Sequence, residues 1–344
     1  MKAITRPQKK NRVPQKENIC AIIITYHPDA DFPDRAMRAA QQAGQLVIID
    51  NHSNDQAIAM IRNVSSRLNA HLILNADNLG VATALNQGVY WARDRGYLWV
   101  LTFDQDTIPL EKMVDNLITV YRDCDFREDI GMIGANYQDP NNGYVYKPIP
   151  HFQDSQQALW EEEKTLITSG SLLSISAFEM VGPFRDELFI DQIDHEYCLR
   201  LRKYGYRILL SLHLGMFQSV GNRKNHKLLW HNFETFNHAP VRRYYIMRNR
   251  LILAREYQGK VRGTIRVLKK SRKDFFRVLF FENQKFSKVY AMVLGIYDGI
   301  RGKAEKLTAN GFLRKKLFSQ SSKYKTSYAH EACSTKNNSK KNKR

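Results

Sequence analysis

Apolar runs separated by polar turns divide the first half of the chain into short strands and amphipathic helices. Runs rich in β-branched residues predict buried strands at 19–25, 46–50, 71–74 and 98–103. Apolar positions at helical spacing predict helices over about 34–43, 56–68 and 81–95. Strict alternation of strand and helix is typical of a doubly wound, mostly parallel α/β sheet, and we expect that fold class.

The pattern continues less regularly after residue 104. It predicts strands at 131–137, 168–175 and 206–212, helices at about 109–121 and 177–181, and a helix that runs through 248–250 to Tyr257. Residues 144–164 are polar, aromatic and irregular, which predicts a loop. We expect a flexible basic N-terminus at 1–18, a main folded domain at 19–257, a basic amphipathic helical extension at 258–320 and a disordered basic tail at 321–344.

Two aspartates follow the fourth predicted strand directly. Asp104 and Asp106 stand one residue apart, so in an extended segment their side chains point the same way. Ligands of an open α/β sheet gather at the carboxyl ends of parallel strands, and paired carboxylates suit Mg²⁺ or Mn²⁺. Two other interpretations fit the same residues locally: a solvated turn, or the nucleophile and acid pair of a haloacid-dehalogenase-type phosphatase.

Further polar residues lie where other predicted strands and helices begin or end. Asp50 closes the second strand, so the strand ends at Thr25, Asp50 and Asp104 are expected to line one crevice. Asp191, Asp194 and Glu196 open a predicted helix, where carboxylates interact favourably with the helix dipole. A carboxylate in a cleft can also act as a general base toward a hydroxyl group.

Composition limits the class of protein. Hydrophobic residues make up 43% and aromatic residues 11% of the 344 positions, which excludes wholesale disorder. The four cysteines are scattered, and there is no apolar stretch typical of a signal peptide, so we expect a reducing compartment and no structural zinc site. No apolar run approaches the roughly 20 residues that span a bilayer.

The net charge of +19 is concentrated in the last third of the chain. Residues 1–240 carry 25 Lys and Arg against 28 Asp and Glu, whereas residues 241–344 carry 28 against 6. Because apolar and aromatic residues recur there at helical spacing, we favour peripheral contact with an anionic membrane. A helical cap with a basic outer face, or a nucleic-acid patch, would share this composition.

Five ordered motifs resemble family 2 glycosyltransferases of the GT-A fold. They comprise the strand with Thr25-Tyr26, the strand ending in Asp50-Asn51, the run Asn78-Leu79-Gly80 to Gly88, the Asp104-x-Asp106 pair, and Asp194 ahead of Cys198-Leu199-Arg200. Phe103 to Thr107, Phe189-Ile190-Asp191, and His238-x-Pro240-x-Arg242-Arg243-Tyr244-Tyr245 resemble the bacterial rhamnosyltransferase branch. The phosphatase interpretation is therefore disfavoured, because that fold carries its Asp-x-Asp on the first strand and here the pair follows the fourth predicted strand.

The resemblance implies a donor site for a nucleotide sugar. Thr25 and Tyr26 would contact base and ribose, and Asp50 would accept a hydrogen bond from the pyrimidine imide. Asn78 and Gly80 would lie close to the nucleoside, although a simple turn at the start of a helix explains them equally well. Arg242 and Arg243 are candidates for the donor diphosphate or for the pyrophosphate of a lipid-linked acceptor; alternatively they form the basic first turn of a membrane-facing helix.

The resemblance also implies the catalytic and metal-binding groups. Asp104 would face the ribose and the metal ion, and Asp106 would ligate the Mg²⁺ or Mn²⁺ that bridges the diphosphate. Family members often add a histidine, and His213 and His238 are the candidates. Asp194 would be the catalytic base of an inverting displacement, with Glu196 and Asp191 as competitors.

We therefore expect a metal-dependent transferase that moves L-rhamnose from dTDP-L-rhamnose to a hydroxyl group. The expected acceptor is a cell-surface polysaccharide of the O-antigen or capsule type, or a polyprenyl-diphosphate-linked glycan. The expected location is cytoplasmic, on the inner face of the inner membrane. One alternative is the same fold with another donor, such as a UDP-sugar. The other is a nucleic-acid-binding protein, although the sequence contains no recognised nucleic-acid-binding motif.

Overall fold

A computed structural model describes residues 13–150, 158–219, 224–228, 231–304 and 307. The chain forms two compact units. Unit 1 comprises the chain up to Phe189 together with Ile193–Val220; unit 2 comprises Ile190–Gln192 and the chain from Gly221 onward. The helix predicted to run to Tyr257 belongs to unit 2.

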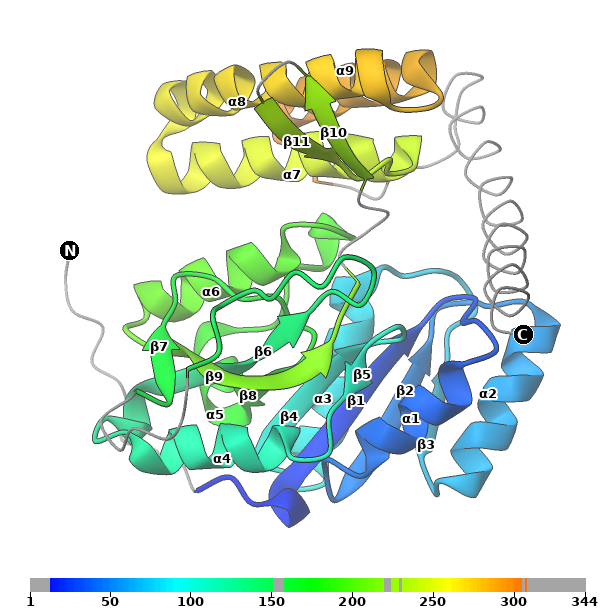
Figure 1. Cartoon of the computed structure of the whole chain (residues 1–344), viewed down its shortest axis with the longest axis vertical. Helices are drawn as coiled ribbons and strands as arrows, with labels where there is room; N and C mark the ends of the chain where they lie inside the picture. Colours follow the sequence, from blue (N-terminus) through cyan, green and yellow to red (C-terminus); the bar gives the residue numbers. More distant parts are fainter. Residues whose placement is uncertain (1–12, 151–157, 220–223, 229–230, 305–306, 308–344) are drawn as a thin grey trace, which may run out of the picture. The chain divides into compact units, whose positions relative to one another are not determined.

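Unit 1 is built on one nine-stranded mixed sheet (Figure 1). Its strands are β1 (Ile19–Thr25), β2 (Gln45–Asp50), β3 (His71–Leu74), β4 (Trp99–Asp104), β5 (Ile108–Pro109), β6 (Ile130–Gln138), β7 (Trp160–Glu162), β8 (Ser171–Ser174) and β9 (Arg207–Phe217). The order is β3-β2-β1-β4-β8-β6-β9-β5, and β7 also pairs with β9.

The first half of this sheet is parallel, as predicted. β1 pairs in parallel with β2 and β4, and β2 pairs in parallel with β3, so Thr25, Asp50 and Asp104 reach one edge of the sheet. The second half is mixed, because β8 runs antiparallel between β4 and β6. The predicted mostly parallel sheet is thus correct for β1 to β4 and for the pairing of β6 with β9.

Helices cover both faces of the sheet of unit 1. They are α1 (Phe32–Ala40), α2 (Asp55–Arg67), α3 (Val81–Asp94), α4 (Met113–Asp123), α5 (Ile175–Val181) and α6 (Ile193–Lys203). Alternate residues of β1 enter two cores: Ala21 and Ile23 pack with α1, α2 and α4, whereas Cys20 and Ile22 pack with α3, α5 and α6. Figure 1 shows α1 and α4 in front of the sheet and α3 and α5 behind it.

Some local predictions need correction. Pro109, predicted to start a helix, lies in the short strand β5, and α4 begins four residues later at Met113. The predicted loop at 144–164 contains strand β7, which pairs with β9. Residues 1–12 of the flexible N-terminus predicted at 1–18, and the tail predicted at 321–344, lie outside the described residues.

The described part of unit 2 contains three helices and a two-stranded hairpin. It contains β10 (Lys224–Leu228), β11 (His231–Thr235), α7 (Pro240–Gln258), α8 (Lys260–Phe281) and α9 (Lys285–Arg301). α9 packs very closely on α7: a Cβ on Gly295 would lie 2.4 Å from the carbonyl oxygen of Tyr244. α8 and α9 lie within the range predicted for the basic helical extension, 258–320, of which residues 305–306 and 308–320 lie outside the described residues. The hairpin was not predicted.

A buried charge network ties the ends of these elements together. Glu282 accepts hydrogen bonds from Arg243 and from Lys288, whose Nζ lies 2.9 Å away, and Lys288 also donates to Asn237. All four side chains are buried within unit 2. Removing one partner of such a network would leave an uncompensated buried charge, so these residues are structural.

None of the helices in the described parts of the chain combines the length and apolar character needed to cross a bilayer.

Candidate active site

The ends of β1 and β2 form a tight polar cluster. Asp50 is buried, and its Oδ1 accepts hydrogen bonds from the hydroxyls of Thr25 at 2.9 Å and Ser53 at 2.5 Å. Its Oδ2 accepts from the backbone N–H of Ser53 at 2.8 Å. A carboxylate has about four acceptor positions, so Asp50 keeps the capacity to accept one further hydrogen bond.

The Asp-x-Asp segment is joined to this cluster through the residue between the two aspartates. The Gln105 side chain accepts from the backbone N–H of Tyr26 at 2.7 Å, and the Gln105 carbonyl accepts from Arg35 Nε at 2.8 Å. The Tyr26 ring is exposed beside this contact. Thr25, Tyr26, Asp50 and Asp104, predicted separately along the sequence, therefore lie at one edge of the sheet.

Asp104 and Asp106 both contact the same buried amide, that of Gln218. Gln218 Nε2 lies 3.5 Å from Asp104 Oδ2 and 3.3 Å from Asp106 Oδ1. Its Oε1 accepts hydrogen bonds from the hydroxyls of Thr107 and Ser169. The two carboxylates thus converge on one polar hydrogen-bond donor, as they would on a cation.

The environment of Asp106 changes its acidity. Nearby protein atoms reduce the hydration of the Asp106 carboxylate, which raises its pKa above the ordinary value. The hydrogen bond from Gln218 and the charge of Arg35 lower the pKa. The residue is nevertheless exposed to solvent. A cation at this position would therefore stabilise the ionised form of Asp106.

The loop before α3 is shaped by close backbone contacts. Gly80 has a φ of +88°, and a Cβ there would lie 2.6 Å from the carbonyl oxygen of Phe189. That carbonyl accepts from Val81 N–H at 2.7 Å, and Asn78 Oδ1 accepts from Gly80 N–H at 3.0 Å. Only glycine fits this conformation and this space, so Asn78 and Gly80 have a structural role whatever else they contact.

The segment ahead of α6 has an unusual backbone. Phe189, Asp191 and Gln192 all have φ between +62° and +65°, a region that residues with a Cβ adopt at a cost. Such conformations persist only where the surrounding structure enforces them, and they cluster at functional sites. Two residues beyond this segment, Asp194 stands in the first turn of α6.

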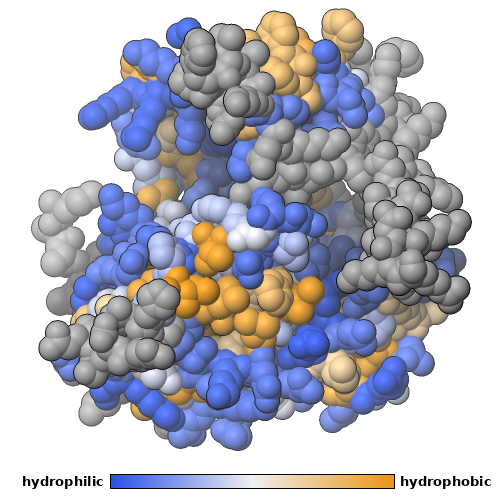
Figure 2. Space-filling view, viewed as in Figure 1, coloured by the Kyte–Doolittle hydropathy of each residue, from blue (hydrophilic) through white to orange (hydrophobic). Residues whose placement is uncertain are grey.

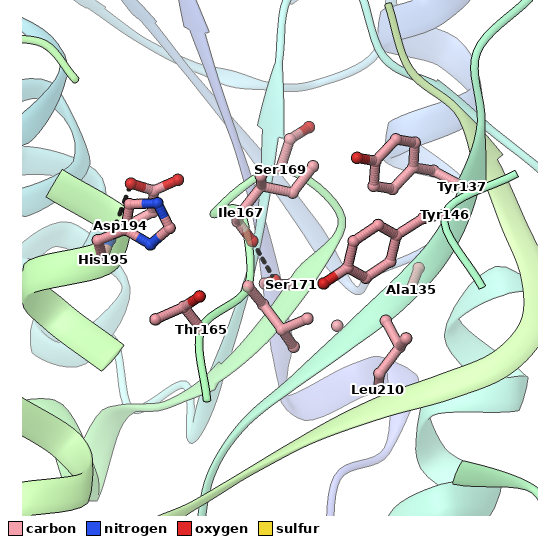
Figure 3. A pocket seen from close by; sticks show the side chains of 12 residues that line it. Ala135, Tyr137, Tyr146, Thr165, Ile167, Ser169, Ser171, Asp194, His195 and Leu210 are labelled. Atoms are coloured by element: carbon pink, nitrogen blue, oxygen red, sulfur yellow. Dashed lines mark hydrogen bonds between the residues drawn. The ribbon is translucent and has the colours of Figure 1, made fainter. Parts of the chain in front are cut away.

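Asp194 lines a cavity of about 170 Å³ in unit 1, together with His195 and residues of β6, β8, β9 and the segment 165–169 (Figure 3). Ser169 lines the same cavity, and its hydroxyl accepts from the backbone N–H of Asp104 at 3.1 Å. The cavity therefore extends from Asp194 to a residue that holds the Asp-x-Asp segment.

The competing base candidates are engaged elsewhere. Glu196 is buried and forms an ion pair with Arg200, whose Nη2 lies 2.9 Å from Glu196 Oε2. Asp191 belongs to unit 2 and pairs with Arg242, with 3.0 Å between Asp191 Oδ2 and Arg242 Nε. Of the three carboxylates predicted here, Asp194 is the one that lines the cavity.

The predicted cationic and histidine ligands are placed differently from the aspartates. Arg243 is held inside unit 2 by Glu282 and offers little surface to an outside diphosphate. His238 also belongs to unit 2, where burial and four neighbouring cations lower its pKa to about 2. His213 is half-buried in β9, and burial lowers its pKa too.

No three His, Cys, Asp or Glu side chains gather into a metal-binding group in the described ranges. A site with fewer protein ligands is still consistent with the expected Mg²⁺ or Mn²⁺. At phosphate-transfer sites Mg²⁺ often uses one or two carboxylates and takes its other ligands from substrate phosphates and water. Asp104 and Asp106 fit that donor set. Gln218, which sequence reasoning missed, occupies the position next to them; a glutamine after a strand gives no local signal.

The sequence of residues 20–182 matches the glycosyl transferase family 2 domain. The described fold is similar to that of S. aureus TarS 1–349, with a TM-score of 0.52 and 15% identity over 87% of this chain and 86% of that one. A longer S. aureus TarS structure is similar with a TM-score of 0.50 and 14% sequence identity, and the match covers 83% of this chain and 49% of that one. Over residues 20–182 the chain is therefore similar to family 2 glycosyltransferases, and its fold is similar to that of GT-A glycosyltransferases.

Among curated proteins, the chain is similar to the dTDP-rhamnosyl transferase RfbF of Shigella flexneri. The two sequences are 28% identical over 297 residues, which cover 83% of this chain and 96% of that protein. The alignment thus extends well beyond the family 2 domain and into the region of α7 to α9.

Proposed function

We propose that the chain is an inverting, metal-dependent rhamnosyltransferase that uses dTDP-L-rhamnose. The observation that carries the metal-dependent part is the convergence of Asp104 and Asp106 on Gln218 at the end of β4. The donor is proposed from the similarity to the rhamnosyltransferase RfbF over most of both chains. The acceptor is a hydroxyl group of a cell-surface glycan, free or linked to a polyprenyl diphosphate.

The proposed mechanism assigns one task to each cluster. The polar cluster at β1 and β2 holds the nucleoside, with Asp50 accepting from the thymine imide. Asp104 and Asp106 would hold Mg²⁺ or Mn²⁺, which when bound neutralises charge on the departing diphosphate. Asp194 takes the proton from the acceptor hydroxyl as its oxygen attacks the anomeric carbon from the face opposite the diphosphate, and the configuration inverts.

The donor assignment predicts a clear preference among nucleotide sugars. With Mn²⁺ present, the purified full chain is expected to release nucleoside diphosphate from dTDP-L-rhamnose at least about tenfold faster than from UDP-glucose or UDP-N-acetylglucosamine. A tenfold preference corresponds to roughly 1.4 kcal/mol of differential transition-state binding. Faster release from a UDP-sugar would show that dTDP-L-rhamnose is not the preferred donor, while the chain would still be a glycosyltransferase.

We also propose that α8 and α9 present a membrane-contacting surface, defined by the exposed residues Val261, Phe280, Phe286 and Val293. Phe286 is 91%, Val261 73% and Phe280 63% exposed. Residues 260–303 carry 12 Lys and Arg against three Asp and Glu. Figure 2 shows apolar residues standing among charged ones on the α8 and α9 part of the surface. Large apolar side chains amid basic ones suit the interface of an anionic bilayer.

The membrane-contacting surface predicts lipid-dependent binding. The full chain is expected to sediment with vesicles of phosphatidylcholine containing phosphatidylglycerol, and at least about fivefold less with phosphatidylcholine alone, since each basic residue near such a surface contributes roughly 1 kcal/mol. Phe280→Ser with Phe286→Ser should weaken binding, whereas Tyr144→Ser, an exposed residue of unit 1, should not. Equal sedimentation with both vesicles, or preferred binding to duplex DNA, would contradict the proposal.

A further inference from the structure

The side chain of Gln105 pairs with the backbone of Tyr26 just beyond the end of a strand pair. The parallel pairing of β1 with β4 ends at Ile24 and Asp104. Past that point, Gln105 Oε1 accepts from Tyr26 N–H at 2.7 Å, and Gln105 Nε2 donates to the Tyr26 carbonyl oxygen at 3.4 Å. A carboxamide can both donate and accept, so it satisfies these two groups as a neighbouring strand would. We call this pair of hydrogen bonds the Gln105 clasp.

The Gln105 clasp joins two loops that carry different groups of the candidate site. On the β1 side, the next residue, His27, donates its backbone N–H to Ser53 Oγ at 2.7 Å, and the Ser53 hydroxyl donates to the Asp50 carboxylate. On the β4 side, Gln105 lies between the two aspartates of the Asp-x-Asp segment. A continuous path of covalent and hydrogen bonds therefore runs from Asp50 to those two aspartates.

Arg35 of α1 connects the same two loops a second time. Its Nε donates to the Gln105 carbonyl oxygen at 2.8 Å, and its Nη2 forms an ion pair with Asp29, which lies in the loop between β1 and α1. The Arg35 side chain is only 12% exposed. A guanidinium presents its donors in a rigid fork, so it holds two partners at a set separation. The spacing between the β1 loop and the Asp-x-Asp segment is thus fixed at two points.

A fixed spacing matters for a ligand that contacts both loops at once. A nucleoside diphosphate has two ends, a base and a diphosphate, and the proposed function places them on different loops. Such a ligand binds tightly when the protein already holds both contact points at the separation that the ligand spans, because binding then orders less of the protein. A ligand with only one of the two ends gains nothing from that spacing.

We propose that Gln105 is a positioning residue that sets the distance between the nucleoside-binding and metal-binding parts of the donor site. It acts through the Tyr26 backbone and through its two neighbours in the chain. The proposal rests on the proposed function and assigns a role to the middle residue of the Asp-x-Asp segment. Loss of the Gln105 clasp should therefore weaken binding of the two-ended nucleotide more than binding of either half.

Two variants and three probes test this role on the full chain with Mn²⁺ present. Gln105→Met removes both hydrogen bonds of the clasp and keeps a side chain of similar length, and Gln56→Met, exposed in α2, is the matched control. Arg35→Lys keeps the positive charge and loses the guanidinium fork. The probes are dTDP, which has both ends, and thymidine and inorganic pyrophosphate, which have one each. Calorimetry and NMR titration give the dissociation constants, and thermal unfolding reports whether each variant is folded.

Gln105→Met should raise the dissociation constant for dTDP about tenfold, the effect of one or two hydrogen bonds, and leave those for thymidine and pyrophosphate within about twofold. Arg35→Lys should act in the same direction by about threefold, and Gln56→Met should change none of them. An unchanged dTDP constant in both Gln105→Met and Arg35→Lys, or an equal loss for either single-ended probe, would refute the positioning role. Failure of the wild-type chain to bind dTDP would instead refute the proposed function.

Discussion

Asp106→Asn is expected to weaken Mn²⁺ binding in the presence of dTDP by roughly 100-fold or more. Residues that merely orient a metal ligand cost about 10- to 100-fold when they are changed, so loss of a carboxylate that the ion contacts should cost at least as much. The expected loss of nucleoside diphosphate release is of similar size. Titration of free Mn²⁺ by electron paramagnetic resonance measures the affinity without relying on turnover.

The same substitution should not destabilise the fold. Loss of hydration raises the pKa of Asp106, so ionised Asp106 opposes folding at neutral pH, and this cost fades only as pH falls from that raised pKa to the ordinary value. The neutral amide removes the cost, and the melting temperature should stay the same or rise slightly. Asp115→Asn, on the exposed side of α4, is the matched control. Unchanged Mn²⁺ affinity in Asp106→Asn would remove Asp106 from the metal site.

Asp194→Asn is expected to lower the rate of transfer by about a thousandfold while leaving dTDP affinity within about twofold. A positioned general base typically contributes 10²- to 10⁴-fold, and an amide of the same shape cannot take the acceptor proton. Loss of turnover with retained nucleotide binding distinguishes a base from a nucleotide ligand. Initial rates of dTDP release with acceptor present, alongside calorimetric dTDP binding, measure both quantities.

Glu196→Gln provides the contrast for Asp194→Asn. Glu196 pairs with Arg200, which also donates to the carbonyl oxygens of Val181 and Pro183. We therefore expect Glu196→Gln to lower the melting temperature with a much smaller effect on turnover per folded molecule. Full transfer activity in Asp194→Asn, or a larger catalytic loss in Glu196→Gln, would assign the base role elsewhere.

The parallel half of the sheet was predictable because its signals are local. β1, β2 and β4 are short apolar runs, and polar residues end each of them, so their boundaries follow from hydrophobicity alone. Parallel pairing then brings Thr25, Asp50 and Asp104 to one edge without any knowledge of the packing. A local contact also begins α2, where the Asn54 side chain accepts from Ala57 N–H at 2.9 Å.

The contacts that complete the site depend on long-range packing. Gln218 reaches Asp104 and Asp106 from more than one hundred residues away, because β9 continues past its predicted end at 212 to Phe217. Bulges in the pairing of β6 with β9 set where Gln218 falls, and no residue pattern announces them. Arg243 matched a family motif, yet Glu282, 39 residues further on, holds it inside unit 2.

The packing of α7 depends on long-range contacts as well. α7 buries residues on most of its circumference, including Tyr244, Met247 and Arg248, so its sequence lacks the one-sided apolar stripe that reveals a packing face. Its close approach to α9 depends on Gly295 and Gly299, whose spacing is meaningful only once the partner helix is known.

The most direct test of the central claim is a crystal structure of the full chain with dTDP and Mn²⁺, with the metal located by anomalous scattering. We expect the manganese peak within coordinating distance of Asp104 or Asp106, roughly 2.0–2.3 Å, with the diphosphate on it and thymine against Asp50. A nucleotide bound away from the ends of β1, β2 and β4, or a manganese peak that neither aspartate contacts, would contradict the account.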